Sequence, residues 1–226
     1  MIAWWWQSVW IGLYVGGVLA IAQWLANHRT ANEYTRKFVH IATGNIILLA
    51  WMLQVTRPVA LGFGLLFCAV TLLSYRYRFL GSLSGVNRRS FGTFFYALSI
   101  SLLVACFWYP DRKIVAVLGI LVMTWGDALA ALVGQSLGRR TYKVLGVRKT
   151  LEGSLTMAAV SFVVALLLVG ITCGWGGSTI FGAGTIAVVA AALEVISVGG
   201  VDNLTVPVGS AILANILLYE CLLPGR

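Results

Sequence analysis

The chain has 226 residues, of which 60% are hydrophobic and only 10% are charged. A soluble domain of this size needs a far more polar surface, so the composition excludes soluble proteins and indicates a polytopic membrane protein. The formal net charge of +9 would suggest a nucleic-acid partner in a soluble protein, but here the position of the charges in the membrane topology must be considered first.

Apolar segments of about 20 residues, the length that crosses a bilayer as a helix, recur along the whole sequence. They predict an all-α fold: a bundle of about eight transmembrane helices in a single domain over residues 1–226. An even number of spans places both termini on the same side. The expected spans are 7–26, 38–56, 58–75, 90–109, 114–137, 153–172, 179–198 and 204–223.

Three connections of this scheme, 27–37, 76–89 and 138–152, are basic and hold three, four and five of the 16 Lys and Arg residues. All three fall on the same side of an eight-span protein. By the positive-inside rule that side is cytoplasmic. The net charge is thereby explained as a topology signal, and no nucleic-acid partner is expected.

The N-terminal residues lack the basic region and the small-residue cleavage site of a signal peptide, so the first span is expected to be retained. The cysteines occur singly in apolar sequence, without the spacing of a metal site. They are predicted to be small core or lipid-facing residues and not members of a disulfide framework. These cysteines are Cys68, Cys106, Cys173 and Cys221.

Asp127 lies inside the span 114–137. A carboxylate in hydrocarbon is costly, so Asp127 is expected to face a polar cavity and to have a cation or a metal ion as its partner. Ala131, Gly134 and Gly138 follow on the same helical face, at i+4, i+7 and i+11. Small residues permit close helix packing, and they would equally allow a ligand to reach the backbone.

The basic segment 138–152 runs into the next span through Lys149-Thr-Leu-Glu-Gly-Ser. A helix start with free N–H groups, small residues and neighbouring lysines favours an anion. No P-loop motif is present. We therefore predict phosphate binding by Lys143 and Lys149, with Gly153 and Ser154 at the helix start.

Further polar residues are expected at the same membrane surface. Arg36 and Lys37 precede His40 at the start of the second span. A lone interfacial histidine is more often a hydrogen-bonding residue than a catalyst, but two adjacent cations favour a function. Glu194 lies within the seventh span, near its cytoplasmic end, and Asp202 either caps the eighth helix or joins the site. Metal-assisted phosphoryl transfer needs such carboxylates for Mg²⁺ and cations for phosphate.

Four of these motifs, in this order and spacing, resemble the polyprenol kinase family, which includes phytol, farnesol and dolichol kinases and the CTP-dependent diacylglycerol kinases. The resemblance covers the core 31–215 and leaves the first span, within 1–30, peripheral. The compact length is most similar to the phytol kinases of cyanobacteria and plastids. The motifs are Arg36-Lys37-x-x-His40-x-x-x-Gly44, Gly126-Asp127-Ala128 with Gly134 and Gly138-Arg139, Lys149-x-x-Glu152-Gly153-Ser154, and Asp202-Asn203-x-x-x-Pro207.

The resemblance implies a kinase that transfers the γ-phosphate of CTP to a membrane isoprenoid alcohol, most simply phytol for tocopherol synthesis, with Mg²⁺ as cofactor. Asp127, His40 and Asp202 would be catalytic. Mg²⁺ would be held by Asp127 with Asp202, Glu194 or Glu152. The nucleotide would be bound by Arg36, Lys37, Arg139, Lys143, Lys149, Gly153, Ser154 and Asn203.

The expected location is a bacterial plasma or thylakoid membrane, with the site on the cytoplasmic side and membrane lipids around it. Three alternatives stay open. The chain could be a kinase for another lipid alcohol, such as farnesol, geranylgeraniol, dolichol or diacylglycerol. It could be a CTP:phosphatidate cytidylyltransferase, which releases pyrophosphate. It could be a small-solute transporter, although the lack of an internal repeat and the crowding of polar groups at one leaflet disfavour this.

Overall fold

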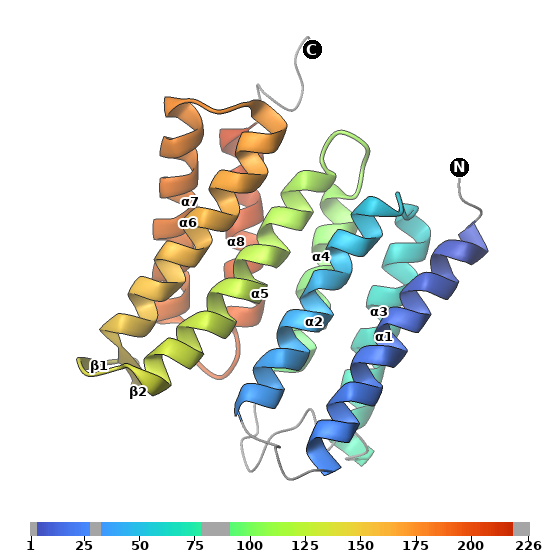
Figure 1. Ribbon diagram of the computed structural model, residues 1–226, viewed down its shortest axis with the longest axis horizontal. Helices are drawn as coiled ribbons and strands as arrows, with labels where there is room; N and C mark the ends of the chain where they lie inside the picture. Colours follow the sequence, from blue (N-terminus) through green and yellow to red (C-terminus); the bar gives the residue numbers. More distant parts are fainter. Residues whose placement is uncertain (1–3, 28–32, 78–90, 219–226) are drawn as a thin grey trace.

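The structure, a computed structural model, describes residues 4–27, 33–77 and 91–218. These residues form eight helices and one β-hairpin (Figure 1). The predicted all-α bundle is therefore confirmed. The elements are α1 (Trp4–Asn27), α2 (Glu33–Met52), α3 (Arg57–Tyr77), α4 (Gly92–Phe107), α5 (Lys113–Ser136), β1 (Thr141–Val144), β2 (Val147–Thr150), α6 (Leu151–Cys173), α7 (Gly177–Ile196) and α8 (Asp202–Leu217).

Each predicted span corresponds to one helix. The largest difference is at α2, which begins at Glu33 because its polar first turns continue the helix beyond the apolar stretch predicted at 38–56. Five helices, α1, α3, α5, α6 and α7, are long and apolar enough to cross a membrane. For the shorter or more polar α2, α4 and α8, membrane crossing stays a prediction.

Successive helices run in alternate directions, so the start of α2, the hairpin and the α7–α8 turn lie at one end of the bundle (Figure 1). The ends of α1 and α3 lie there too. The described parts of the three basic connections are thus at the same end, as the topology predicts. We refer to this end as the hairpin end. Residues 78–90, including Arg88 and Arg89, and the end of the last predicted span lie outside the described residues.

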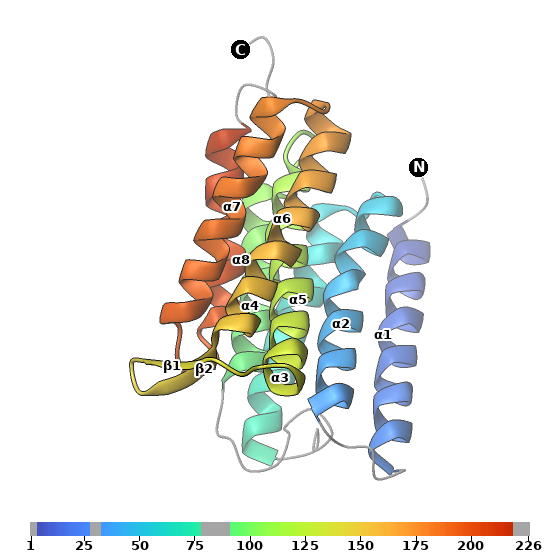
Figure 2. The same cartoon turned by 60° about the vertical axis from the view of Figure 1, so that its left-hand side comes forward.

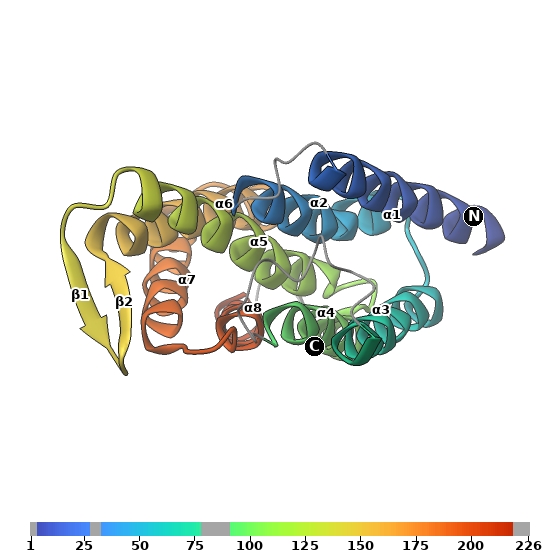
Figure 3. The same ribbon diagram turned by 90° about the horizontal axis from the view of Figure 1, so that it is seen from below.

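Helix α5 is the centre of the bundle and packs against α2, α4, α6 and α8 (Figure 3). Every residue from Ile114 to Thr124 is buried, as expected for a helix that is apolar on all sides. At Gly119 a Cβ atom would lie 2.4 Å from the carbonyl oxygen of Pro207, so only glycine allows this approach of α8. Helix α1 packs on α2 at the edge of the bundle.

The segment 138–152, predicted as a loop, contains the antiparallel hairpin β1–β2, which extends sideways below α6 and α7 (Figure 2). Leu145 and Gly146 form its turn with positive φ angles of 47° and 80°, the backbone that a two-residue hairpin requires. The loop prediction was too coarse, since both strands carry β-branched residues, which favour extended backbone.

The cysteine prediction needs one correction. Cys68 and Cys106 are free, but Cys173 is disulfide-bonded, and Cys221 lies outside the described residues. Single cysteines far apart in apolar sequence carry no spacing signal, so the pairing of Cys173 was not detectable from the pattern.

Candidate active site

The intramembrane carboxylate of Asp127 forms an ion pair with Lys37 of α2. Its Oδ2 atom is 2.6 Å from Lys37 Nζ, and the side chains are only 17% and 7% exposed. Lys37 Nζ also lies 3.4 Å from the Asp127 carbonyl oxygen. A buried charge is tolerated when it is paired in this way, and removal of either partner would strand the other. The cation expected beside Asp127 is therefore a lysine from a different helix.

His40 completes this cluster from the next turn of α2. Its Nε2 atom is 3.6 Å from Asp127 Oδ2, which is too long for a hydrogen bond, and it has no other hydrogen-bond partner among the described residues. The imidazole is 13% exposed and stacks on the ring of Tyr96 with 4.3 Å between ring centroids. An unpaired ring nitrogen thus faces a carboxylate in a buried site.

A second ion pair joins the hairpin to α7. Lys149 Nζ is 2.6 Å from Glu194 Oε1 and also donates to the Glu194 carbonyl oxygen. The other carboxylate atom, Glu194 Oε2, is buried without a hydrogen-bond partner within the described part of the chain. A buried acceptor that lacks a donor is costly, so this atom is a candidate ligand for a cation.

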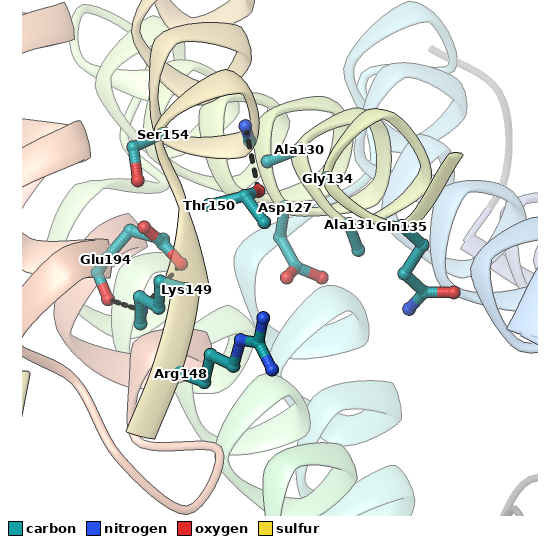
Figure 4. A pocket seen from close by; sticks show the side chains of 11 residues that line it. Asp127, Ala130, Ala131, Gly134, Gln135, Arg148, Lys149, Thr150, Ser154 and Glu194 are labelled. Carbon is teal, nitrogen blue, oxygen red and sulfur yellow. Dashed lines mark hydrogen bonds and ion pairs between the residues drawn. The ribbon is translucent and has the colours of Figure 1, made fainter. Parts of the chain in front are cut away.

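A pocket of about 200 Å³ lies between α5, the hairpin, α6 and α7 (Figure 4). The Asp127 carboxylate and the Arg148 guanidinium point toward one another there. Of the small residues predicted on the Asp127 face, Ala131 and Gly134 line the pocket, whereas Gly138 does not. The lining residues are Asp127, Ala130, Ala131, Gly134, Gln135, Arg148, Lys149, Thr150, Gly153, Ser154 and Glu194.

The start of α6 differs from the open anion site that the sequence predicted. Thr150 is the N-cap, and its Oγ1 accepts the Gly153 N–H at 3.2 Å, so this donor is already used. Ser154 hydrogen-bonds to the Tyr142 hydroxyl. Glu152 accepts the main-chain N–H of Arg140 at 3.2 and 3.3 Å outside the pocket, so its geometry suits a fold-stabilising role better than the expected metal ligand.

Asp202 is the first residue of α8, ahead of its apolar stretch, and its side chain does not cap the helix. Burial raises the pKa of its carboxyl, the charge of Asp127 raises it further, and Lys149 and Lys37 oppose this shift. Asp202 therefore lies within electrostatic reach of both ion pairs, although it does not line the pocket. Asn203 donates to the Gly200 carbonyl oxygen at 3.3 Å, which stabilises the turn before α8.

The structure separates the predicted cations into two groups. Lys37 and Lys149 are in the two ion pairs, whereas Arg36, Arg139 and Lys143 are exposed and do not line the pocket. A loop has no regular alternation of side chains, so the prediction of a loop at 138–152 could not indicate which basic side chains are exposed. Four polar residues of the site region were not predicted from the sequence: Tyr96, Gln135, Arg148 and Thr150.

Only Arg148 had a usable sequence signal, because it stands directly beside Lys149 in a segment with β-branched residues. Tyr96 is one aromatic residue among several in an apolar span. Its proximity to His40, from a helix more than 50 residues away, is visible only in the fold.

Comparison with known proteins agrees with the motifs. No family model matches the chain, and no solved structure matches it significantly. A phytol kinase of Synechocystis sp. is 47% identical over 203 residues, which cover 89% of this chain and 87% of that protein. At this identity and coverage the chain belongs to the polyprenol kinase family, and it is a kinase that phosphorylates an alcohol.

Proposed function

We propose that this membrane protein transfers the γ-phosphate of CTP to the hydroxyl of phytol, using Mg²⁺. The named activity of the 47% identical relative supports phytol as the acceptor. The observation that supports a phosphoryl-transfer site most strongly is the pair of buried carboxylate–lysine contacts, Asp127–Lys37 and Glu194–Lys149, on either side of one pocket. A metal-bound nucleotide requires charges of both signs, carboxylates for the metal ion and cations for the phosphate oxygens.

The nucleotide phosphates occupy the pocket beside the hairpin. Lys149 exchanges its carboxylate partner for a phosphate oxygen, and Arg148 offers a planar guanidinium that can bind two phosphate oxygens together. Gly134 and Gly153 present no side chain there; a Cβ on Gly153 would lie 3.0 Å from the Ala130 carbonyl oxygen. The site therefore neutralises charge and positions the phosphates, the main sources of rate in this chemistry.

The donor atoms of the pocket suit Mg²⁺. Within the described ranges no three His, Cys, Asp or Glu side chains form a site that could hold a metal alone. Mg²⁺ in kinases is commonly held by one or two carboxylates together with substrate phosphates. Asp127 and Glu194 line the pocket, and the unpartnered Glu194 Oε2 favours a cation. Bound there, the ion would neutralise charge on the phosphates.

The alcohol approaches the pocket from the side of α2 and α4, which place His40 against the pocket-lining Asp127. Its hydroxyl oxygen attacks the γ-phosphorus, the bond to the bridging oxygen breaks, and CDP leaves. The hydroxyl proton passes to His40 Nε2, the ring nitrogen without a partner. The hairpin end faces the cytoplasm in this proposal, since the basic connections and the soluble nucleotide belong on the same side.

The test is a panel of phytol, geranylgeraniol, farnesol and diacylglycerol against the four nucleoside triphosphates, with purified protein in detergent. We expect label from γ-labelled CTP to appear in phytyl phosphate, and chelation of Mg²⁺ to abolish it. Label in pyrophosphate would instead indicate a cytidylyltransferase. Phosphorylation of another alcohol in preference to phytol would contradict the proposed acceptor.

A further inference from the structure

Tyr96 of α4 is a buried polar residue that the proposed mechanism does not use. It is only 3% exposed. Its ring lies nearly parallel to the His40 imidazole, with an interplanar angle of 21° and 4.3 Å between centroids. Because His40 belongs to α2, the stack joins two helices directly beside the carboxylate of Asp127.

The orientation of the Tyr96 ring is fixed through its hydroxyl. Tyr96 Oη lies 2.6 Å from Thr124 Oγ1, and Thr124 itself donates to the Ile120 carbonyl oxygen at 2.6 Å. A threonine hydroxyl has one hydrogen, which Thr124 gives to Ile120, so Tyr96 is the donor toward Thr124; Tyr96 Oη also lies 3.5 Å from the His40 carbonyl oxygen. The result is a directed chain of hydrogen bonds that anchors Tyr96 to the central helix α5.

The hydroxyl groups of Tyr96 and Thr124 lie directly against the backbone of α2 at Gly44. A Cβ atom on Gly44, one turn after His40 in α2, would lie 2.1 Å from Tyr96 Oη and 2.0 Å from Thr124 Oγ1. Glycine therefore lets α2 approach closely enough for His40 to lie on the Tyr96 ring. This explains physically why glycine stands four residues after the histidine.

We infer that Tyr96 is a positioning residue for His40: it holds the imidazole so that Nε2 faces Asp127 Oδ2 at the place where the alcohol is deprotonated. This inference rests on the proposed function. The ring is stacked on one face, which restricts rotation about its side-chain torsions. Misplacement of a reacting group by about 1 Å can cost 100-fold in rate, so a supporting residue of this kind affects turnover.

The experiment compares Tyr96→Phe and Thr124→Val, which break the hydrogen-bond chain but keep the stack, with Tyr96→Leu, which removes both. We expect kcat to fall about 10-fold in the first two and about 100-fold in the third. KM for CTP should stay within about twofold, because neither Tyr96 nor Thr124 lines the pocket that holds the phosphates. The matched control is Tyr14→Phe, since Tyr14 Oη bonds to the Ala42 carbonyl oxygen of α2 at 2.8 Å and not to the chain that holds Tyr96.

A second readout separates positioning from general stability. In a His40→Asn background, Tyr96→Phe should have no further effect on the residual kcat, because the group that it positions is gone. The inference would be overturned if Tyr96→Phe lowered kcat by the same factor in the wild-type and His40→Asn backgrounds. It would also be overturned if Tyr14→Phe lowered kcat as much as Tyr96→Phe does, or if Tyr96→Phe left kcat unchanged. Failure of the wild-type protein to phosphorylate any alcohol would overturn the proposed function instead.

Discussion

The two ends of the bundle both carry buried or half-buried cations, but they satisfy them differently. At the end opposite the hairpin, Arg57 lies over the Tyr109 ring at 4.5 Å and donates to the Ala105 carbonyl oxygen. Lys113 donates to Gln54 Oε1 at 3.0 Å and lies 5.5 Å from the Trp108 ring. These partners are all neutral. At the hairpin end Lys37 and Lys149 are paired with carboxylates.

The difference indicates at which end the charged side chains can exchange their partners for a ligand. A cation bonded to carbonyls and aromatic rings ties loops and helices together, although Arg57 Nε is buried without a hydrogen-bond partner among the described residues. A lysine–carboxylate pair can exchange either partner, the carboxylate for a phosphate or the lysine for a metal ion, at small net change in charge. We therefore assign stability to the first end and chemistry to the hairpin end, and the following substitutions test this division.

The largest effect is expected for Asp127→Asn. The variant keeps the shape of the side chain but loses the charge that pairs with Lys37, so turnover should fall by about 1,000-fold or more. The measurement is the initial rate with γ-labelled CTP and phytol. The control is Asp111→Asn, since Asp111 is exposed at the opposite end. Near-normal turnover of Asp127→Asn would refute its role.

Next in size is Lys149→Met, which we expect to lower kcat/KM for CTP about 100-fold because a phosphate contact is lost and Glu194 is left unpaired. Lys113→Met, its counterpart at the other end, should stay within about threefold. Steady-state kinetics over a range of CTP concentrations measures both. Similar losses in the two variants would mean that the ends are not functionally distinct.

A smaller effect is expected within the hairpin. Arg148→Ala should raise KM for CTP about 10-fold, since Arg148 lines the pocket. Lys143 pairs with Arg148 across the strands and both side chains are exposed, but Lys143 does not line the pocket, so Lys143→Ala should change KM much less. The reverse order of effects would favour the sequence-based prediction over the geometry.

The smallest effect on activity is expected at the opposite end. Trp108 Nε1 donates to the Val55 carbonyl oxygen at 2.8 Å and is buried, so Trp108→Phe should lower the free energy of unfolding by about 1 kcal/mol or more. Turnover below the melting temperature should not change. A thermal melt in detergent measures the change in stability, and the labelling assay measures turnover. A variant that is stable but inactive would contradict the assignment.

The order and approximate bounds of the eight helices could be predicted from the sequence, because long apolar runs report directly on helices in a membrane. Asp127 could also be singled out, since an isolated carboxylate in hydrocarbon needs a partner. Which cation pairs with it could not be derived, because Lys37 is brought to Asp127 by the packing of α2 on α5. Sequence spacing reports neighbours on one helix only.

The hairpin shows the same limit. The cluster of five basic residues could be recognised, but the fact that Lys149 and Arg148 line the pocket while Lys143 and Arg139 do not depends on which strand packs there: the lining residues of the hairpin come from β2, which contacts α6. Glu152 was predicted as a metal ligand from the resemblance of its motif, whereas at the start of α6 its carboxylate accepts the main-chain N–H of Arg140. The charges of these side chains could be predicted from the sequence, but the directions in which the side chains point could not.

The most direct measurement is photo-crosslinking with a CTP analogue that carries a reactive group on its γ-phosphate, followed by mass spectrometry of the labelled peptides. We expect label within residues 127–154 or around Glu194, reduced by excess CTP and by Lys149→Met. Label concentrated around Arg57 and Lys113, or label that Lys149→Met leaves undiminished, would contradict the claim that the phosphate is handled at the hairpin end.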